Sequence, residues 1–193
     1  LTGIGIETLD DPAGSAAKLL AEGCIIGWYQ GRSEFGPRAL GNRSILADPG
    51  RANMKDQINA RVKYREEFRP FAPSVLVDRA SEIFNIKSPS PFMTVACDVK
   101  AGWTERLIAT THINNTARVQ TVSPEDNAPY HALITAFNDL NGSPVVLNTS
   151  FNIKGQPIVE SPLDAISTFA GTGLDAVILG PYIVRKPETP RVG

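Results

Sequence analysis

The chain has 193 residues, of which 42% are hydrophobic and 20% charged, and its formal net charge is −1. This length suits one domain with a sizeable core, and this composition is typical of a globular protein and excludes a disordered chain. No apolar run is long enough to span a membrane, and two cysteines and two histidines far apart in the sequence predict no metal site. We therefore expect a cytoplasmic protein whose thiols are reduced.

The first half of the chain predicts strands and helices on either side of a polar loop. Residues 1–13 are expected to be a linker or an edge segment from an absent N-terminal domain. A helix is predicted at Ser15–Glu22 and a buried strand at Cys24–Gly31. The elements that follow are expected to be a strand at Arg43–Ala47, a helix at Arg51–Val62, a strand at Phe71–Val77 and a short helix at Arg79–Phe84. In the second helix, apolar residues recur at four-residue spacing from Met54 to Val62, which predicts one buried face.

The second half mixes strands and helices without strict alternation. The predicted strands are Met93–Val99, Ile108–Ile113, Ala117–Val122, Pro144–Leu147, Ala176–Leu179 and Tyr182–Val184. A helix is expected at Tyr130–Leu140, and Ser161 followed by Pro162 predicts the start of another. The pattern indicates an α+β (mixed α/β) fold, with a strongly twisted mixed sheet flanked by helices over residues 14–186 and a tail at 187–193.

A glycine-rich loop, GRSEFGPRALGNRSIL, follows the first buried strand and carries three arginines. Residues 31–69 contain nine Lys and Arg against five Asp and Glu, a net charge of +4, so the rest of the chain carries −5. Glycine lets backbone N–H groups approach a ligand, and guanidinium groups match phosphate or carboxylate. The segment therefore predicts an anion site, and the alternative is a surface loop whose arginines pair with local acids.

Four blocks carry a resemblance to a known family: EFGPRALGNRSILADP, YREEFRPFAPSV, TARVQTV and NTSFNIKGQPIVESP. From about Ala21 to about Leu179, the sequence resembles the C-terminal, YrdC-like domain of the carbamoyltransferases of antibiotic tailoring and nodulation-factor modification. The resemblance implies that this domain uses ATP, with Mg²⁺ carried by the nucleotide, and carbamoyl phosphate to form carbamoyl-adenylate. It also implies that a separate N-terminal transferase domain of the same polypeptide passes the carbamoyl group to a hydroxyl acceptor.

The resemblance also selects site residues, because YrdC-like domains line their nucleotide pocket with a Lys-x-Arg pair and a Ser-x-Asn pair. The predicted catalytic cations are Lys63, Arg65 and Arg38. The predicted nucleotide- or phosphate-binding residues are Arg43, Arg69, Ser150, Asn152, Arg118 and His112. Arg38 and Arg43 are expected to project from the glycine loop toward carbamoyl phosphate or the phosphate of the adenylate.

Several of these residues have a structural alternative. Arg38 and Arg43 would instead be buried with Glu34 or Asp48, and NTSFN would be a turn that satisfies its own backbone. Arg69 would form an ion pair with a neighbouring glutamate, and His112 would be either a neutral base or a core histidine. The family usually has His-x-Asp-Gly-Thr-x-Arg where this chain has HINNTAR, and the missing acid weakens any metal or proton-transfer role at that turn.

Two other functions are compatible with a YrdC-like domain. One is RNA binding, which the negative net charge and the absence of a long basic stripe disfavour, so nucleic acid is not the expected partner. The other is a non-catalytic docking domain that binds no nucleotide. The sequence names neither the carbamoyl acceptor nor the oligomeric state, and a homodimer stays open.

Overall fold

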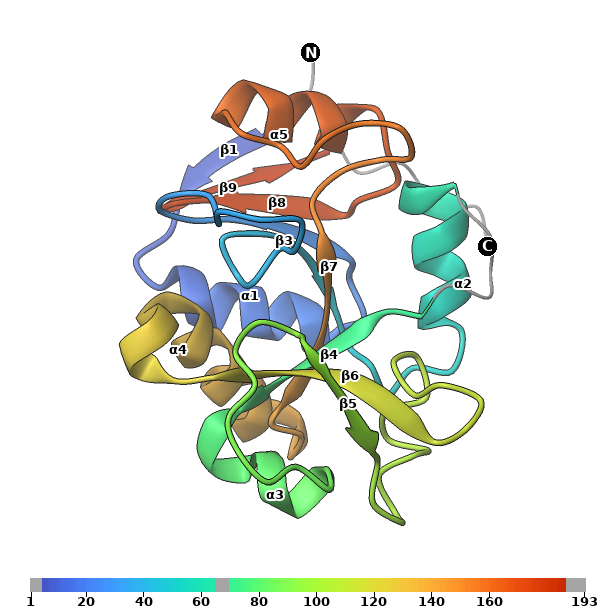
Figure 1. Cartoon of the computed structure of the whole chain (residues 1–193). Helices are drawn as coiled ribbons and strands as arrows, with labels where there is room; N and C mark the ends of the chain where they lie inside the picture. The colour runs from blue at the N-terminus through green and yellow to red at the C-terminus, as the bar shows by residue number, and fades with distance from the viewer. Residues whose placement is uncertain (1–4, 65–69, 187–193) are drawn as a thin grey trace.

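The computed structural model describes residues 5–64 and 70–186, and in this part of the chain one mixed sheet carries helices on both faces (Figure 1). In chain order, the first elements are β1 (Gly5–Thr8), α1 (Pro12–Ala21), β2 (Ile26–Tyr29), β3 (Arg43–Ala47), α2 (Met54–Ile58), the π-helical turn η1 (Asn59–Lys63) and β4 (Ala72–Leu76). The remaining elements are η2 (Val77–Arg79), α3 (Ala80–Ile83), β5 (Val95–Asp98), β6 (Thr116–Val122), α4 (Pro124–Asn141), β7 (Val145–Ser150), α5 (Pro162–Ala170), β8 (Ala176–Leu179) and β9 (Tyr182–Arg185).

The nine strands lie in the order β1-β9-β8-β2-β3-β7-β4-β6-β5. Two pairs, β2 with β8 and β4 with β6, are parallel, and the other pairs are antiparallel. β8 and β9 run across the molecule while β7 runs down it, so the sheet twists along its length (Figure 1). This arrangement confirms the predicted mixed α/β fold.

The helices bury the two faces of the sheet because strand side chains alternate between them. α1 and α4 pack together over one face, where Leu20 and Phe137 meet Ile26 and Trp28 of β2 (Figure 1). α2, η1 and α5 cover the other face, where Met54, Ile58, Val62 and Phe169 pack beside Ile45 and Phe151. A third cluster joins α3 to β5 and β6.

Several predicted elements are confirmed, with shifted ends. β3 spans Arg43–Ala47 as predicted, and Met54, Ile58 and Val62 are all fully buried. The second helix is shorter than expected, since its last residues form the π-helical turn η1 and Tyr64 then adopts a left-handed backbone with φ of 48°. α5 begins after Ser161 with the predicted cap, in which the Asp164 side chain accepts from the Ser161 N–H.

The prediction of a strand at Ile108–Ile113 is wrong. The N–H groups of Thr110 and Thr111 both donate to Leu107 O, and both threonine hydroxyls donate to the same oxygen. These local bonds hold the segment in turns, because threonine can offer the backbone an alternative to a sheet ladder.

Other boundaries differ from the predictions. α4 begins at Pro124, where Ser123 caps it by accepting from Asp126 N, but it is kinked at Asn127, and the predicted helix from Tyr130 corresponds to the part after the kink. Gly5–Thr8, which lies in the segment expected to be a linker or an edge segment, does form an edge strand, β1, which pairs with β9. No helix in residues 5–64 and 70–186 combines the length and apolar character needed to cross a membrane.

Candidate functional site

The candidate site lies where several strand ends meet at one edge of the sheet. β7 runs antiparallel to both β3 and β4, and β6 runs parallel to β4. The C-terminal end of β7, at Ser150, therefore lies beside the N-terminal ends of β3 and β4, and the start of β6 is next along the sheet. The glycine loop of residues 31–42 joins β2 to β3 at this edge. Loops held by such a rigid scaffold are frequent positions for binding residues.

Arg43 closes the base of the glycine loop. Its Nη1 donates to Gln30 O at 2.7 Å and to Asn42 O at 2.9 Å, and its Nη2 donates to Gly31 O at 3.1 Å. The guanidinium carbon lies 3.5 Å from the centroid of the Tyr29 ring, and Arg43 is only 3% exposed. The expectation that Arg43 projects from the loop is wrong, because its donors are turned to the carbonyls where the loop leaves β2 and returns to β3.

Glu34 holds the part of the glycine loop that leads into β3. Its Oε1 accepts from Leu40 N at 2.8 Å and from Asn42 N at 2.7 Å. The carboxylate is therefore bonded to backbone instead of forming the alternative ion pair with an arginine of the loop. The middle of the glycine loop, from Phe35 to Arg38, is exposed.

Arg38 and Arg118 line one small cavity at this edge. Its volume is about 80 Å³. Its lining consists of residues from the glycine loop, β4, β6 and β7 and their neighbours: Pro37, Arg38, Ala39, Pro70, Phe71, Ala72, Met93, Arg118, Asn148, Thr149 and Ser150. Burial, followed by the positive charge of Arg38, lowers the pKa of the Arg118 guanidinium. Two neighbouring positive charges repel each other, and an anion bound between them would offset this repulsion.

Lys63, Ser150 and Asn152 form one bonded group at the end of β7. The Lys63 ammonium is buried and donates to Ser150 O at 2.5 Å, to Asn152 O at 3.0 Å and to Asn152 Oδ1 at 2.9 Å. Ser150 Oγ donates to the same Asn152 Oδ1 at 2.7 Å. The structure thus brings Lys63 together with two residues that lie 87 and 89 positions later in the sequence. Their contact with nucleotide stays a prediction.

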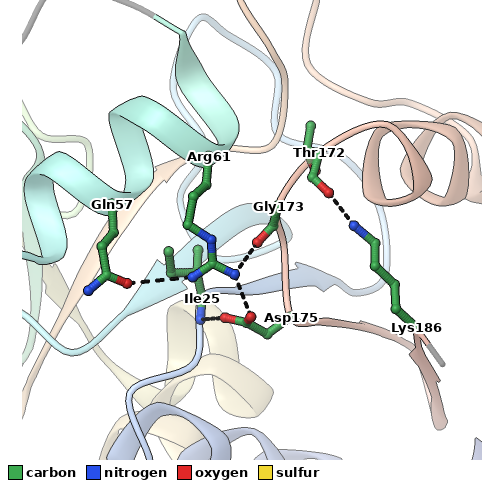
Figure 2. A network of polar contacts seen from close by, with 7 residues as sticks. All are labelled: Ile25, Gln57, Arg61, Thr172, Gly173, Asp175 and Lys186. Carbon is green, nitrogen blue, oxygen red and sulfur yellow. Dashed lines mark hydrogen bonds and ion pairs between the residues drawn. The ribbon is translucent and has the colours of Figure 1, made fainter. Parts of the chain in front are cut away.

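The turn that carries Lys63 is itself anchored by Arg61, as Figure 2 shows. Arg61 Nη2 donates to Gly173 O and to Asp175 Oδ1, both at 2.5 Å, and Nη1 donates to Gln57 Oε1 at 3.5 Å. The other carboxylate oxygen of Asp175 accepts from Ile25 N at 2.7 Å. Farther along the same network, Lys186 donates to Thr172 O (Figure 2). The network ties η1 to the segment before β8 and so fixes the position of Lys63.

The hydrogen bonds of His112 indicate which of its two ring nitrogens carries a hydrogen. The Thr116 hydroxyl donates to Asn114 Oδ1 at 2.8 Å, so its oxygen accepts from His112 Nδ1–H at 2.9 Å. In the neutral ring the lone pair then lies on Nε2, which is buried and has no hydrogen-bond partner among the described residues. Burial, followed by the charges of Arg118 and Lys55, lowers the pKa of His112. The two alternatives that the sequence left open, a base and a core histidine, both stay predictions.

Two predicted residues, Arg65 and Arg69, lie outside the described residues. Their roles stay predictions.

A buried polar cluster beneath the glycine loop was missed by sequence reasoning. Asn148 Nδ2 donates to Ala39 O at 3.1 Å and to Gln120 Oε1 at 2.9 Å, and Gln120 Nε2 donates to Leu40 O at 2.8 Å. Ser74 Oγ completes the cluster by donating to Gln120 Oε1 at 2.6 Å. The sequence signal was the first Asn of NTSFN, which follows the apolar run VVL directly and so falls inside a buried strand.

A wider cavity of about 380 Å³ adjoins the first, with Pro37 in both linings. Its other lining residues come from the glycine loop and from the segment after β7: Ser33, Glu34, Gly36, Asn152, Pro157, Ile158 and Glu160. Its volume is in the range of small-molecule sites, which begin at roughly 300 Å³, whereas the first cavity admits only a small group.

Comparison with known proteins identifies the class. Residues 17–186 match the family described as "Carbamoyltransferase C-terminus". The chain belongs to this family, as a C-terminal carbamoyltransferase domain with a YrdC-like fold.

Among its relatives, the nodulation protein NolO of Bradyrhizobium diazoefficiens is 52% identical over 95% of this chain and 34% of its own length. The 3'-hydroxymethylcephem-O-carbamoyltransferase of Amycolatopsis lactamdurans is 37% identical over 88% of this chain and 32% of its own length. The chain therefore spans about a third of the length of these relatives.

Solved structures share the fold at low sequence identity. The structure of E. coli YciO aligns with a TM-score of 0.60 at 18% identity, over 92% of this chain and 81% of YciO. Full-length HypF, in its phosphate- and nucleotide-bound form, aligns with a TM-score of 0.60 at 16% identity, over 91% of this chain and 22% of HypF.

Proposed function

We propose that this chain is the ATP-dependent, carbamoyl-adenylate-forming domain of an O-carbamoyltransferase. The observation that carries the proposal is the pair of guanidinium groups, Arg38 and Arg118, on one small cavity that is also bordered by Ser150. Ser150 is in turn bonded to the buried ammonium of Lys63. Cations and hydroxyl donors around one small cavity suit an acyl phosphate beside the phosphates of a nucleotide.

The relatives support the same reaction class. The Amycolatopsis relative is named as an O-carbamoyltransferase, and the HypF structure is described as phosphate- and nucleotide-bound. Because this chain corresponds to about a third of the relatives, we assign transfer to the hydroxyl acceptor to a separate N-terminal domain of the same polypeptide.

In the proposed reaction, water adds to the carbonyl carbon of carbamoyl phosphate, and inorganic phosphate leaves, which yields carbamate. A carbamate oxygen then attacks the α-phosphorus of ATP. The bond from that phosphorus to the bridging oxygen breaks, so pyrophosphate leaves and carbamoyl-adenylate remains. Arg38 and Arg118 would bind the anionic group in the small cavity and oppose the charge that develops on the phosphates.

The nucleotide would extend into the wider cavity, on the side of Asn152. Carboxylates in that lining, such as Glu160, suit the hydroxyl groups of a ribose better than a phosphate. No group of three or more histidine, cysteine or acidic side chains in residues 5–64 and 70–186 is arranged to hold a metal. Mg²⁺ would therefore arrive on the phosphates of ATP and neutralise part of their charge, which is its usual mode of binding at such sites.

The experiment is a melting curve with Mg-ATP, followed by the same measurement with RNA. At about 100 times its Kd, a ligand that binds only the folded chain stabilises it by roughly 2.7 kcal/mol. A melting temperature that does not change with millimolar ATP would favour a docking domain. Tight RNA binding with a steep salt dependence and weak ATP affinity would favour the RNA-binding alternative.

Activity assays on the isolated chain test whether adenylate formation and transfer to the acceptor belong to separate domains. With ATP and carbamoyl phosphate it should release pyrophosphate, and the adenylate should decompose in water. No hydroxyl acceptor should be carbamoylated, because a reactive intermediate needs a closed path to its second site. Mass spectrometry that found a carbamoylated acceptor would contradict the two-domain assignment.

A further inference from the structure

Asn148 has an amide oxygen that nothing in the described chain satisfies. The residue is 1% exposed, and its Oδ1 has no hydrogen-bond partner in residues 5–64 and 70–186. An unsatisfied buried acceptor is rare and costly in a folded protein. It therefore points to a partner that the chain itself does not provide.

The orientation of this amide follows from its neighbours. Nδ2 donates to the backbone oxygen of Ala39, which can only accept, so the amide nitrogen belongs on that side. Gln120 is fixed in the same way, since its Nε2 donates to Leu40 O and its Oε1 accepts from Ser74 and from Asn148. Rotating either side-chain amide by a half turn would place its oxygen against another acceptor oxygen in the buried cluster. Oδ1 is thus the end of the Asn148 amide that is buried without a hydrogen-bond partner among the described residues.

Asn148 lines the small cavity that Arg38 and Arg118 also line, and this cavity is bordered by a second buried group without a hydrogen-bond partner, which is a donor. Asn148 and Arg118 both line the cavity of about 80 Å³, and Arg118 Nε is a buried donor with no partner in the described part of the chain. Arg38 adds a further positive charge to this lining. A ligand that satisfies the cavity must carry an anionic acceptor for the guanidinium groups and an N–H or O–H donor for Asn148.

We infer that Asn148 is a specificity residue that accepts a hydrogen bond from the amino group of the carbamoyl moiety. This inference rests on the proposed function, because it takes carbamoyl phosphate as the ligand of the cavity. The phosphate oxygens accept from Arg38 and Arg118, and the –NH₂ group donates to Asn148 Oδ1. An acyl phosphate with a methyl group in place of –NH₂ leaves this acceptor buried and unsatisfied, so the site rejects it. Selection by a buried polar group is strong for this reason.

The test compares carbamoyl phosphate with acetyl phosphate, which replaces –NH₂ by –CH₃ and keeps the phosphate. Calorimetric titration of the wild-type chain should give a preference for carbamoyl phosphate of about tenfold or more, the effect of one unsatisfied buried acceptor. Asn148→Leu should reduce the ratio of the two Kd values to about one, since no acceptor remains. Inorganic phosphate, measured in parallel, should bind more weakly than carbamoyl phosphate.

Ser74→Ala is the matched control. It removes a hydrogen bond from the same buried cluster without removing the acceptor, so the preference should persist. If Asn148→Leu weakens both acyl phosphates equally, Asn148 only supports the fold and the inference is wrong. If Asn148→Leu does not fold, the wild-type ratio alone decides, and equal affinities for the two acyl phosphates, or phosphate binding as tight as that of carbamoyl phosphate, overturn the inference. A wild-type chain that binds neither acyl phosphate overturns the proposed function as well.

Discussion

Replacing Asp175 by asparagine tests whether the network in Figure 2 positions the turn that carries Lys63. The carboxylate accepts from Arg61 through Oδ1 and from Ile25 N through Oδ2, so both oxygens are in use. An asparagine offers one oxygen and one –NH₂ group. One of the two donors must then lose its acceptor and face another donor.

The magnitude follows from the burial of the two contacts. Leaving a buried donor such as Ile25 N unsatisfied costs about 1–3 kcal/mol. The ion pair itself contributes less, because the side chains of Arg61 and Asp175 are 36% and 32% exposed, and pairs open to solvent contribute within about 1 kcal/mol. We therefore expect Asp175→Asn to lower the free energy of unfolding by about 2 kcal/mol and Tm by roughly 4–8 °C in a chain of this length.

The assay is a melting curve of each variant with and without Mg-ATP. Asp175→Asn should lower Tm and also reduce the ATP-induced rise in Tm, because the turn that holds Lys63 loses its anchor. Glu82→Gln is the control, since it breaks the exposed pair between Arg79 and Glu82 and should leave Tm unchanged.

A Tm for Asp175→Asn equal to that of Glu82→Gln would refute the account of the network. A lower Tm with an undiminished ATP response would show that the network stabilises the fold without positioning Lys63.

Three further substitutions test the site. Lys63→Met removes the ammonium that holds Ser150 and Asn152, so ATP affinity should fall by about 1–3 kcal/mol in a titration; unchanged affinity in a folded variant would make Lys63 purely structural. Arg38→Lys keeps the positive charge but loses the two parallel N–H donors of the planar guanidinium, so the affinity for carbamoyl phosphate should fall by about tenfold. A small change would indicate that Arg38 acts only through its charge. The pKa of His112 is lowered below its ordinary value of 6.5, so as pH falls below that value the unfolded chain binds the proton first and stability is lost. His112→Gln should therefore weaken the fall in Tm between about pH 7 and pH 5, and identical profiles for wild type and His112→Gln would contradict the lowered pKa of His112.

Several local elements of this protein follow from its sequence. The four-residue spacing from Met54 to Val62 predicted a buried helical face, and all three of its apolar residues are fully buried. Ser161 and Pro162 predicted the start of α5, where the capping box is found. These features depend on periodicity and on bonds between residues a few positions apart, and a sequence displays both directly.

The motifs also indicated which segments would form the candidate site. Lys63 was predicted to act with Ser150 and Asn152, and the structure bonds the three together. The sequence could not show that the ammonium is already surrounded by their oxygens. Nor could it show that Arg43 turns inward to close the loop while Arg38 stays on the surface, because both arginines stand in the same polar stretch.

Only the tertiary structure decided which distant groups share a cavity. Arg38 and Arg118 are eighty positions apart, and they meet because β3, β7, β4 and β6 are neighbours in the sheet. Ile108–Ile113 has the composition of a strand but forms turns held by local threonine bonds. The unsatisfied oxygen of Asn148 likewise exists only because Ala39 and Gln120 orient its amide. Strand pairing and the satisfaction of buried polar groups are set by contacts between residues far apart in the chain, and local sequence does not encode them.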